Sequence, residues 1–188
     1  MTLVVTLPNA LTLLRILAVP FFGIFVWYGR MSWAFAIFVL AGVTDLLDGW
    51  VARVLNQRSS LGAILDPAAD KLLMTTAFVL MAIPQPHLVV TIPVWVSILG
   101  ITRDVVITFV ALMSAGRFEV HRFSPSILGK VTTGTEVVVV ALALLLNALG
   151  PGPWVSLFSP WIFWVVAGMV LASGIHYFLR ATSEPVGV

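Results

Sequence analysis

Four aspartates stand at regular intervals in one segment, and their type and spacing suit metal or proton chemistry. The segment, residues 44–71, reads TDLLDGWVARVLNQRSSLGAILDPAADK. Asp45 and Asp48 have i,i+3 spacing and Asp66 and Asp70 have i,i+4 spacing, so each pair lies on one face of an α-helix. Two antiparallel helices joined by a short loop can therefore direct all four carboxylates into one space.

Carboxylates gathered in this way repel one another unless a cation lies among them. The cost rises further in a bilayer, where each acid is unfavourable by about 2.5–3.5 kcal/mol. Carboxylate oxygens are hard ligands that suit Mg²⁺, Mn²⁺ or Ca²⁺, and two such ions can neutralise a diphosphate while holding it for displacement. The alternative interpretation is that these acids are ordinary residues near a loop that pair with Arg53, Arg58 and Lys71.

Small residues and one arginine are interleaved with the aspartates. Gly49, Ala52 and Gly62 lack bulky side chains, so a flat base or a phosphate could approach the backbone there. Arg53 can donate paired, charge-assisted hydrogen bonds to a phosphate. The alternative for the small residues, and for Ala52 in particular, is close packing between helices in a bilayer.

The elements that position these residues are expected to be membrane helices. The chain has 188 residues, of which 60% are hydrophobic and 10% charged, and its mean hydropathy is +1.09. These values exclude an ordinary soluble domain. The sequence contains no cysteine, which excludes disulfides and thiolate metal sites, and a net charge of +2 does not suggest nucleic-acid binding.

Six apolar segments are long enough to cross a bilayer as helices. We predict an all-α integral membrane protein with a single domain over residues 1–188 and no removable signal peptide. The predicted spans are residues 9–28, 31–55, 61–83, 88–113, 126–149 and 158–180.

Basic residues set the expected orientation, because cytoplasmic connections carry an excess of Lys and Arg. The basic residues of the second-to-third and fourth-to-fifth connections are Arg53, Arg58, Arg117 and Arg122. With six spans, both termini share that cytoplasmic side. The two aspartate pairs reach similar depths from the same side, whereas the opposite halves of the helices are almost uncharged. We therefore expect a polar cavity open to the cytoplasm. A cation or proton transporter, the remote alternative, would need polar access from both faces.

The aspartate segment resembles the signature of the CDP-alcohol phosphotransferase family. Its pattern is D-x2-D-G-x2-A-R-x8-G-x3-D-x3-D, and every spaced position is matched. The resemblance implies a bundle of six transmembrane helices, usually assembled as a homodimer among membrane lipids. It also implies transfer of a phosphatidyl group from CDP-diacylglycerol to an alcohol, with release of CMP.

The resemblance further assigns roles to single residues. Asp45, Asp48 and Asp66 are implied to be ligands of two Mg²⁺ or Mn²⁺ ions, and Asp70 is implied to be both a ligand and the general base. The residues implied to bind the CDP portion are Gly49, Ala52, Arg53 and Gly62. A rival chemistry with a histidine nucleophile is not favoured, because His87, His121 and His176 are scattered and none begins an H-x-K pattern.

Two further cations bear on the acceptor alcohol. Arg103 and Lys130 fall within predicted spans, where each is costly unless it meets an anion. We interpret them as a pocket for a phosphate carried by an anionic acceptor. The alternative is that Arg103 pairs with a motif aspartate or with Glu136, and that Lys130 extends to the bilayer interface.

A second resemblance narrows the acceptor. Pro8-Asn9-x2-Thr12-x2-Arg15 and Gly129-Lys130-Val131-x-Thr133 are similar to the branch that contains phosphatidylglycerophosphate synthases and eukaryotic-type cardiolipin synthases. Thr102-Arg103-Asp104 is closer to the cardiolipin-synthase pattern. We expect glycerol 3-phosphate as the acceptor, with phosphatidylglycerol as the alternative. Arg15 is expected either to contact substrate or to anchor the first helix at the lipid headgroups.

Overall fold

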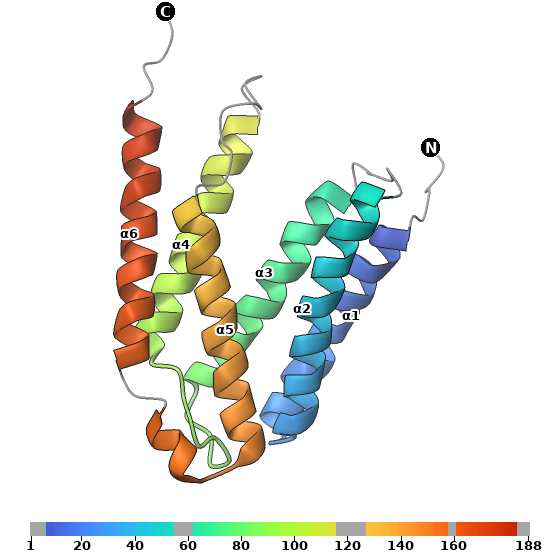
Figure 1. Ribbon diagram of the computed structural model, residues 1–188, viewed down its shortest axis with the longest axis vertical. Helices are drawn as coiled ribbons and strands as arrows, with labels where there is room; N and C mark the ends of the chain where they lie inside the picture. The colour runs from blue at the N-terminus through green and yellow to red at the C-terminus, as the bar shows by residue number, and fades with distance from the viewer. Residues whose placement is uncertain (1–6, 55–61, 116–126, 158–160, 184–188) are drawn as a thin grey trace, which may run out of the picture.

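The structure is a computed structural model of residues 1–188, and it describes residues 7–54, 62–115, 127–157 and 161–183. Within these ranges, the side chains of residues 48–54, 62–64 and 66, among others, are not described. The described chain forms α-helices and one short 3-10 helix, η1 (Figure 1). Their bounds are α1 Leu7–Trp27, α2 Met31–Val54, α3 Gly62–Ala82, α4 Val94–Ala115, α5 Ile127–Leu149, η1 Pro153–Leu157 and α6 Trp161–Ser183.

The helices agree with the predicted spans except at the start of the fourth. We predicted a start at residue 88, whereas α4 begins at Val94. Pro93 directly precedes this helix, and a proline disfavours helical backbone at the residue before it. Val94 is consequently the first residue from which an uninterrupted helix can run.

Residues 88–93 are apolar but are held in an irregular conformation by tertiary hydrogen bonds. The Asn147 side chain of α5 accepts hydrogen bonds from the backbone N–H groups of Val89 and Val90 at 2.6 and 3.0 Å, and it donates to the Val90 carbonyl at 2.8 Å. The Ile92 N–H donates to the Met81 carbonyl at 2.9 Å. A buried amide thus satisfies the backbone that a helix would otherwise have satisfied.

The helices form two groups that are joined at one end. Helix α1 packs against α2 and α3, α6 packs against α4 and α5, and contacts of α2 with α5 and α3 with α4 connect the groups. The groups diverge towards the end of the bundle at which α1 begins and α6 ends (Figure 1). The last turns of α2 and the first turns of α3, which carry the aspartates, lie at this diverging end.

Apolar side chains fill the joined end and also cover the outside of the bundle. The core there includes Phe22, Phe38, Met81 and Leu144, none more than 4% exposed. On the outer face of α1, by contrast, Leu17 is 63% exposed. Apolar residues exposed along whole helices are typical of a surface that faces lipid.

By length and composition alone, two helices in the described part of the chain qualify as membrane spans. They are Ala10–Trp27 and Ile127–Leu149, with mean hydropathies of 2.0 and 1.8. Shorter apolar stretches occur in α2 and α6, at Met31–Asp45 and Trp161–Tyr177. Asp70 and Lys71 of α3 and Arg103 and Asp104 of α4 lie near the centres of their helices and line a cavity inside the bundle.

Candidate functional site

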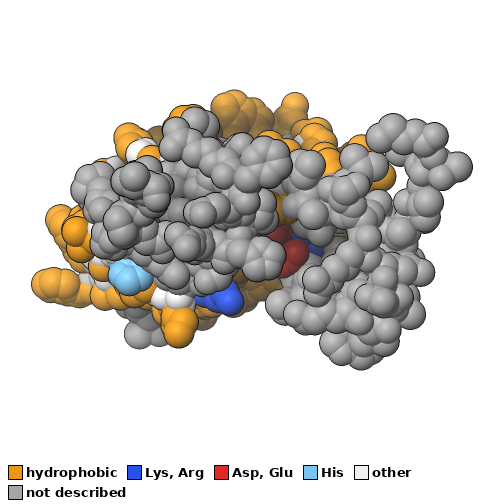
Figure 2. All heavy atoms as spheres, turned by 90° about the horizontal axis from the view of Figure 1, so that it is seen from above, with side chains coloured by type: hydrophobic (Ala, Val, Ile, Leu, Met, Phe, Trp, Pro, Cys, Tyr) orange, Lys and Arg blue, Asp and Glu red, His pale blue; other side chains and the backbone are white. Residues whose placement is uncertain are grey.

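A cavity of about 1040 Å³ lies between the two groups of helices, and each of the six α-helices contributes to its wall. Its described charged side chains are Arg15, Asp45, Asp70, Lys71, Arg103, Asp104 and Lys130. Figure 2, viewed from the end at which α1 begins, shows acidic and basic side chains near the middle and hydrophobic ones along the left and upper edges. Part of the cavity wall is therefore charged, and hydrophobic side chains cover the outside of the bundle.

Asp45 of α2 and Asp70 of α3 meet at this cavity, as their spacing predicted. Nη1 of Arg15, from α1, donates to Asp45 Oδ1 at 3.0 Å and to Asp70 Oδ1 at 2.8 Å. Because both oxygens contact the same nitrogen atom, they lie close to each other. The Arg15 side chain is 1% exposed, whereas those of Asp45 and Asp70 are 43% and 45% exposed. Arg15 thus lines the cavity beside both acids, and its contact with substrate stays a prediction.

The donor atoms of this pair suit the metals implied by the sequence. Two carboxylate oxygens from different helices converge on one cation, and oxygen donors of this kind are the ligands that Mg²⁺ and Mn²⁺ prefer. Among the described side chains there is no cluster of three or more potential metal ligands. Asp48 and Asp66 lie on α2 and α3, but their side chains are outside the described part of the structure. The cluster of four therefore stays a prediction.

The residues expected to bind the CDP portion also lie on described helices, but their side chains are not described. Gly49, Ala52 and Arg53 belong to the last turns of α2, and Gly62 begins α3, so the helices extend as the motif requires. Their side-chain surroundings are not among those that the structure describes. The basic residues Arg58, Arg117 and Arg122, used above for orientation, also lie outside the described residues.

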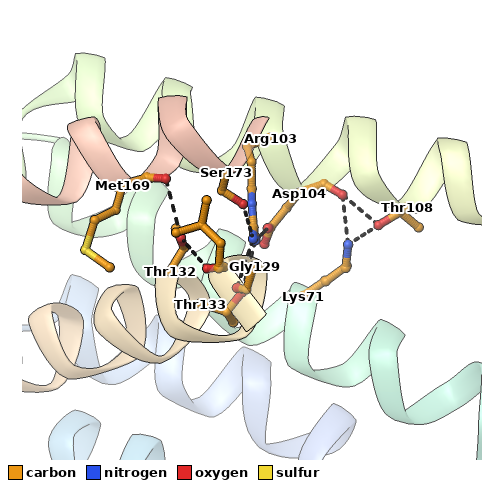
Figure 3. A network of polar contacts seen from close by, with 10 residues as sticks. Lys71, Arg103, Asp104, Thr108, Gly129, Thr132, Thr133, Met169 and Ser173 are labelled. Atoms are coloured by element: carbon orange, nitrogen blue, oxygen red, sulfur yellow. Dashed lines mark hydrogen bonds and ion pairs between the residues drawn. The ribbon is translucent and has the colours of Figure 1, made fainter. Parts of the chain in front are cut away.

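On the opposite wall, Arg103 of α4 is held in a hydrogen-bond network (Figure 3). Its Nη1 donates to Asp104 Oδ1 at 2.8 Å and to Thr133 Oγ1 at 3.0 Å. Its Nη2 donates to the Gly129 carbonyl at 3.0 Å and to Ser173 Oγ at 3.2 Å. Arg103 therefore links α4 to α5 and α6, and its ion-pair partner is Asp104, where we had considered a motif aspartate or Glu136.

Two lysines on the cavity wall differ in their surroundings. Nζ of Lys71, on α3, donates to the Asp104 carbonyl at 2.8 Å and to Thr108 Oγ1, which connects the two groups of helices (Figure 3). Lys130, near the start of α5, is exposed and lines the cavity. Of the two, Lys130 is the better placed to contact a soluble anion that enters the cavity.

Glu136 of α5 lies in a closely packed position behind this wall. It is 1% exposed, and its Oε1 has no hydrogen-bond partner among the described residues. A Cβ atom added at Gly100 of α4 would be 3.2 Å from this oxygen and 3.3 Å from the Phe78 ring. Gly100 therefore permits the close approach of α4 to the Glu136 carboxyl group.

One side of the cavity is apolar and borders the outside of the bundle. It is formed by Val39, Gly42 and Val43 of α2 together with Gly134 and Val137 of α5. Val39 and Val43 are 38% and 46% exposed, and a Cβ atom added at Gly42 or Gly134 would meet nothing within 4 Å. This wall offers room for hydrocarbon chains beside the charged groups.

Several residues of the site were not identified from the sequence. Lys71 follows Asp70 directly, and this adjacency was the available signal that it faces the same region. Ser173 and Tyr177 of α6 carried no signal, because that helix has a generic apolar composition. Their contribution depends on how α6 packs against α4.

Comparison with known proteins gives consistent matches along most of the chain. The family described as CDP-alcohol phosphatidyltransferase matches residues 5–172. A protein of Bacillus subtilis (strain 168) is 37% identical over 191 residues, covering 93% of this chain and 94% of its own. Proteins of Escherichia coli (strain K12) and Shigella flexneri serotype 5b are each 35% identical over 182 residues, covering 95% of this chain and 96% of their own. All three are named CDP-diacylglycerol--glycerol-3-phosphate 3-phosphatidyltransferase.

Proposed function

The chain belongs to the CDP-alcohol phosphatidyltransferase family, and on this premise we propose that it transfers a phosphatidyl group from CDP-diacylglycerol to glycerol 3-phosphate. The products are phosphatidylglycerophosphate and CMP. Membership also agrees with the expected fold class, an all-α integral membrane protein with six transmembrane helices. The names of the relatives support glycerol 3-phosphate over phosphatidylglycerol, the acceptor of a cardiolipin synthase.

One structural observation carries this function: charged groups of both signs share a cavity with an apolar wall. Asp45 and Asp70 face it from one side, Lys130 and Arg103 face it from the other, and the apolar wall lies between α2 and α5. A liponucleotide has a diphosphate and two acyl chains, so it requires these environments next to each other. A small phosphorylated alcohol requires only the basic side.

We assign the metal-ligand role to the aspartates of the motif. Asp45 and Asp70 have oxygens suited to divalent cations, and Asp48 and Asp66 belong to the same motif on the same helices. Two Mg²⁺ or Mn²⁺ ions held there would supply charge neutralisation for the diphosphate and the departing CMP. Gly49, Ala52, Arg53 and Gly62 form the proposed contact with the CDP portion.

Asp70 is the proposed general base. Its carboxylate faces the cavity, so it can accept the proton of the acceptor hydroxyl group as the hydroxyl oxygen attacks the phosphorus atom that carries diacylglycerol. The bond from that phosphorus to the CMP oxygen breaks, and CMP leaves with the electron pair. General-base assistance typically accelerates such a step by about 10²–10⁴-fold.

Lys130 is proposed to bind the phosphate of glycerol 3-phosphate by direct contact, and Arg103 is proposed to attract it by charge alone. Lys130 is exposed and can reach the phosphate directly. The terminal nitrogens of Arg103 already donate to four protein acceptors. We therefore assign Arg103 a supporting role, in which its charge makes the wall attractive to an anion.

The proposal extends to the arrangement in the membrane. Helix α1 begins and α6 ends at the same end of the bundle, which supports placing both termini on one side (Figure 1). We propose that this side is cytoplasmic and that the reaction takes place in that half of the bilayer. We also propose that residues 1–188 form one domain and that the protein works as a homodimer.

The test is acceptor-dependent release of CMP. Purified protein in mixed micelles is incubated with CDP-diacylglycerol and Mg²⁺ or Mn²⁺, and CMP is measured with glycerol 3-phosphate, with phosphatidylglycerol and without acceptor. We expect release with glycerol 3-phosphate, formation of phosphatidylglycerophosphate, and loss of both in EDTA. Release with phosphatidylglycerol alone would identify a cardiolipin synthase instead, and no release with any acceptor would reject the proposed reaction.

A further inference from the structure

Arg15 occupies an unusual position for a residue outside the aspartate motif. Its side chain is 1% exposed, and one nitrogen, Nη1, donates to an oxygen of Asp45 and to an oxygen of Asp70. The two carboxylates are each more than two-fifths exposed towards the cavity. A fixed positive charge is thus placed behind two acids that remain accessible.

This geometry makes Arg15 a rival for the oxygens that a metal would use. A guanidinium group is permanently charged, and a buried one is strongly disfavoured without an anionic partner. Arg15 therefore holds Asp45 and Asp70 firmly. A divalent cation bound to the same Oδ1 atoms would lie next to the guanidinium, and like charges at such short distances repel.

We propose that Arg15 is an internal competitor of the divalent cations, so that metal binding at Asp45 and Asp70 requires the guanidinium to give up its contact to at least one of these two acids. This inference rests on the proposed function, because it takes both aspartates as metal ligands. The free protein then binds metal weakly. A diphosphate in the cavity adds negative charge and offsets the repulsion, so metal and liponucleotide bind cooperatively.

The guanidinium can also find a new anionic partner once it leaves an aspartate. Arg15 lines the same cavity as the two acids. Arginine forms paired, charge-assisted hydrogen bonds with phosphate groups. Contact with the diphosphate would retain a partner for the buried charge and would couple the two binding events further.

The experiment measures binding of Mn²⁺ to purified protein, by the electron paramagnetic resonance signal of free Mn²⁺, with and without CDP. The variant Arg15→Gln removes the competing charge. Its matched control is Arg30→Gln, which removes the same charge at an exposed position beyond the other end of α1. We expect Arg15→Gln to bind Mn²⁺ about tenfold more tightly than wild type without CDP, and CDP to tighten Mn²⁺ binding in wild type much more than in Arg15→Gln.

A second readout is thermal stability in EDTA, which does not depend on metal. Loss of the ion pairs should lower the melting temperature of Arg15→Gln by several degrees, with Arg30→Gln unchanged. If Arg15→Gln does not fold, Arg15→Lys serves instead, because a single ammonium group holds two carboxylates less well and should raise Mn²⁺ affinity by a smaller factor.

The outcomes separate the two proposals. Equal or weaker Mn²⁺ binding by a folded Arg15 variant would overturn the competition and would make Arg15 a positioning residue for the aspartates. The proposed function would still stand after that result if the wild-type protein binds Mn²⁺ and releases CMP. Wild-type protein that binds no Mn²⁺, with or without CDP, would reject the metal site itself and the competition with it.

Discussion

Arg15 and Arg103 are two buried arginines on the wall of one cavity, yet their surroundings differ. Arg15 is 3% and Arg103 is 8% exposed. Arg15 contacts carboxylates that are themselves half-exposed, whereas Arg103 donates to a carboxylate, two hydroxyl groups and a backbone carbonyl on three helices. Burial alone therefore does not define the role of a charge. Partners that are accessible from the cavity allow exchange with a ligand, whereas backbone and hydroxyl partners from several helices fix a structure.

The largest expected effect is on activity, and it comes from replacing Asp70, one of the two acids that contact Arg15. Asp70→Asn keeps the shape of the side chain but removes its ability to accept a proton from the acceptor. We expect CMP release to fall by about 10²–10⁴-fold, the range for loss of a general base. Binding of CDP, measured separately, should weaken much less than turnover, because the other three proposed metal ligands remain. Turnover within tenfold of wild type in this variant would remove Asp70 from the base role.

The next largest expected effect is a loss of stability on replacement of Arg103. Arg103→Met leaves Asp104 without its cation and breaks the links to α5 and α6. We expect a loss of about 3 kcal/mol, the low end for breaking a buried pair, because the Asp104 side chain is 23% exposed. Thermal unfolding of the detergent-purified protein measures it. Arg15→Gln should cost less, and the reverse order would contradict the contrast drawn between the two arginines.

Close packing on the Arg103 side can be tested with a single methyl group. Gly100→Ala places Cβ 3.2 Å from the Glu136 carboxylate and 3.3 Å from the Phe78 ring. We expect a loss of about 1–3 kcal/mol in the free energy of unfolding, as for other overpacked cores. Gly168→Ala in α6, where Cβ would meet nothing within 4 Å, is the control. Alanine favours a helix over glycine, so this control should be neutral or slightly stabilised.

The smallest expected effect concerns the exposed lysine. Lys130→Gln should raise KM for glycerol 3-phosphate about tenfold, equivalent to about 1.4 kcal/mol, because one charged contact to the phosphate is lost. KM for CDP-diacylglycerol should stay constant, and stability should change by less than about 0.5 kcal/mol, as for most surface substitutions. An equal rise in both KM values would show that Lys130 does not discriminate between the substrates.

The sequence predicted the helices well because a bilayer imposes a length and an apolar composition on each span. It failed at residues 88–93, which are as apolar as a helix would be. Their conformation is set by Pro93 and by the distant Asn147 and Met81, whose contacts depend on tertiary structure. Local composition does not encode such contacts.

The candidate site, too, could be predicted from the sequence only in part. Helical spacing was sufficient to bring Asp45 and Asp70 to one place, because the period of the helix fixes which residues share a face. It could not identify Arg15 as their partner, since this depends on the rotation of α1 against α2 and α3. For Arg103 we expected an anionic partner, but which acid it meets was settled by the geometry around Asp104 and Thr133.

The apolar wall between α2 and α5 has a consequence for how the two substrates would reach each other. With the exposed valines of α2 at its rim, this wall borders the outside of the bundle, whereas Lys130 lies near the first turn of α5. On the proposed function, the donor arrives sideways by two-dimensional diffusion within the leaflet, and glycerol 3-phosphate arrives from the aqueous phase. Reactants that never share a solvent thus meet without the lipid having to leave the bilayer.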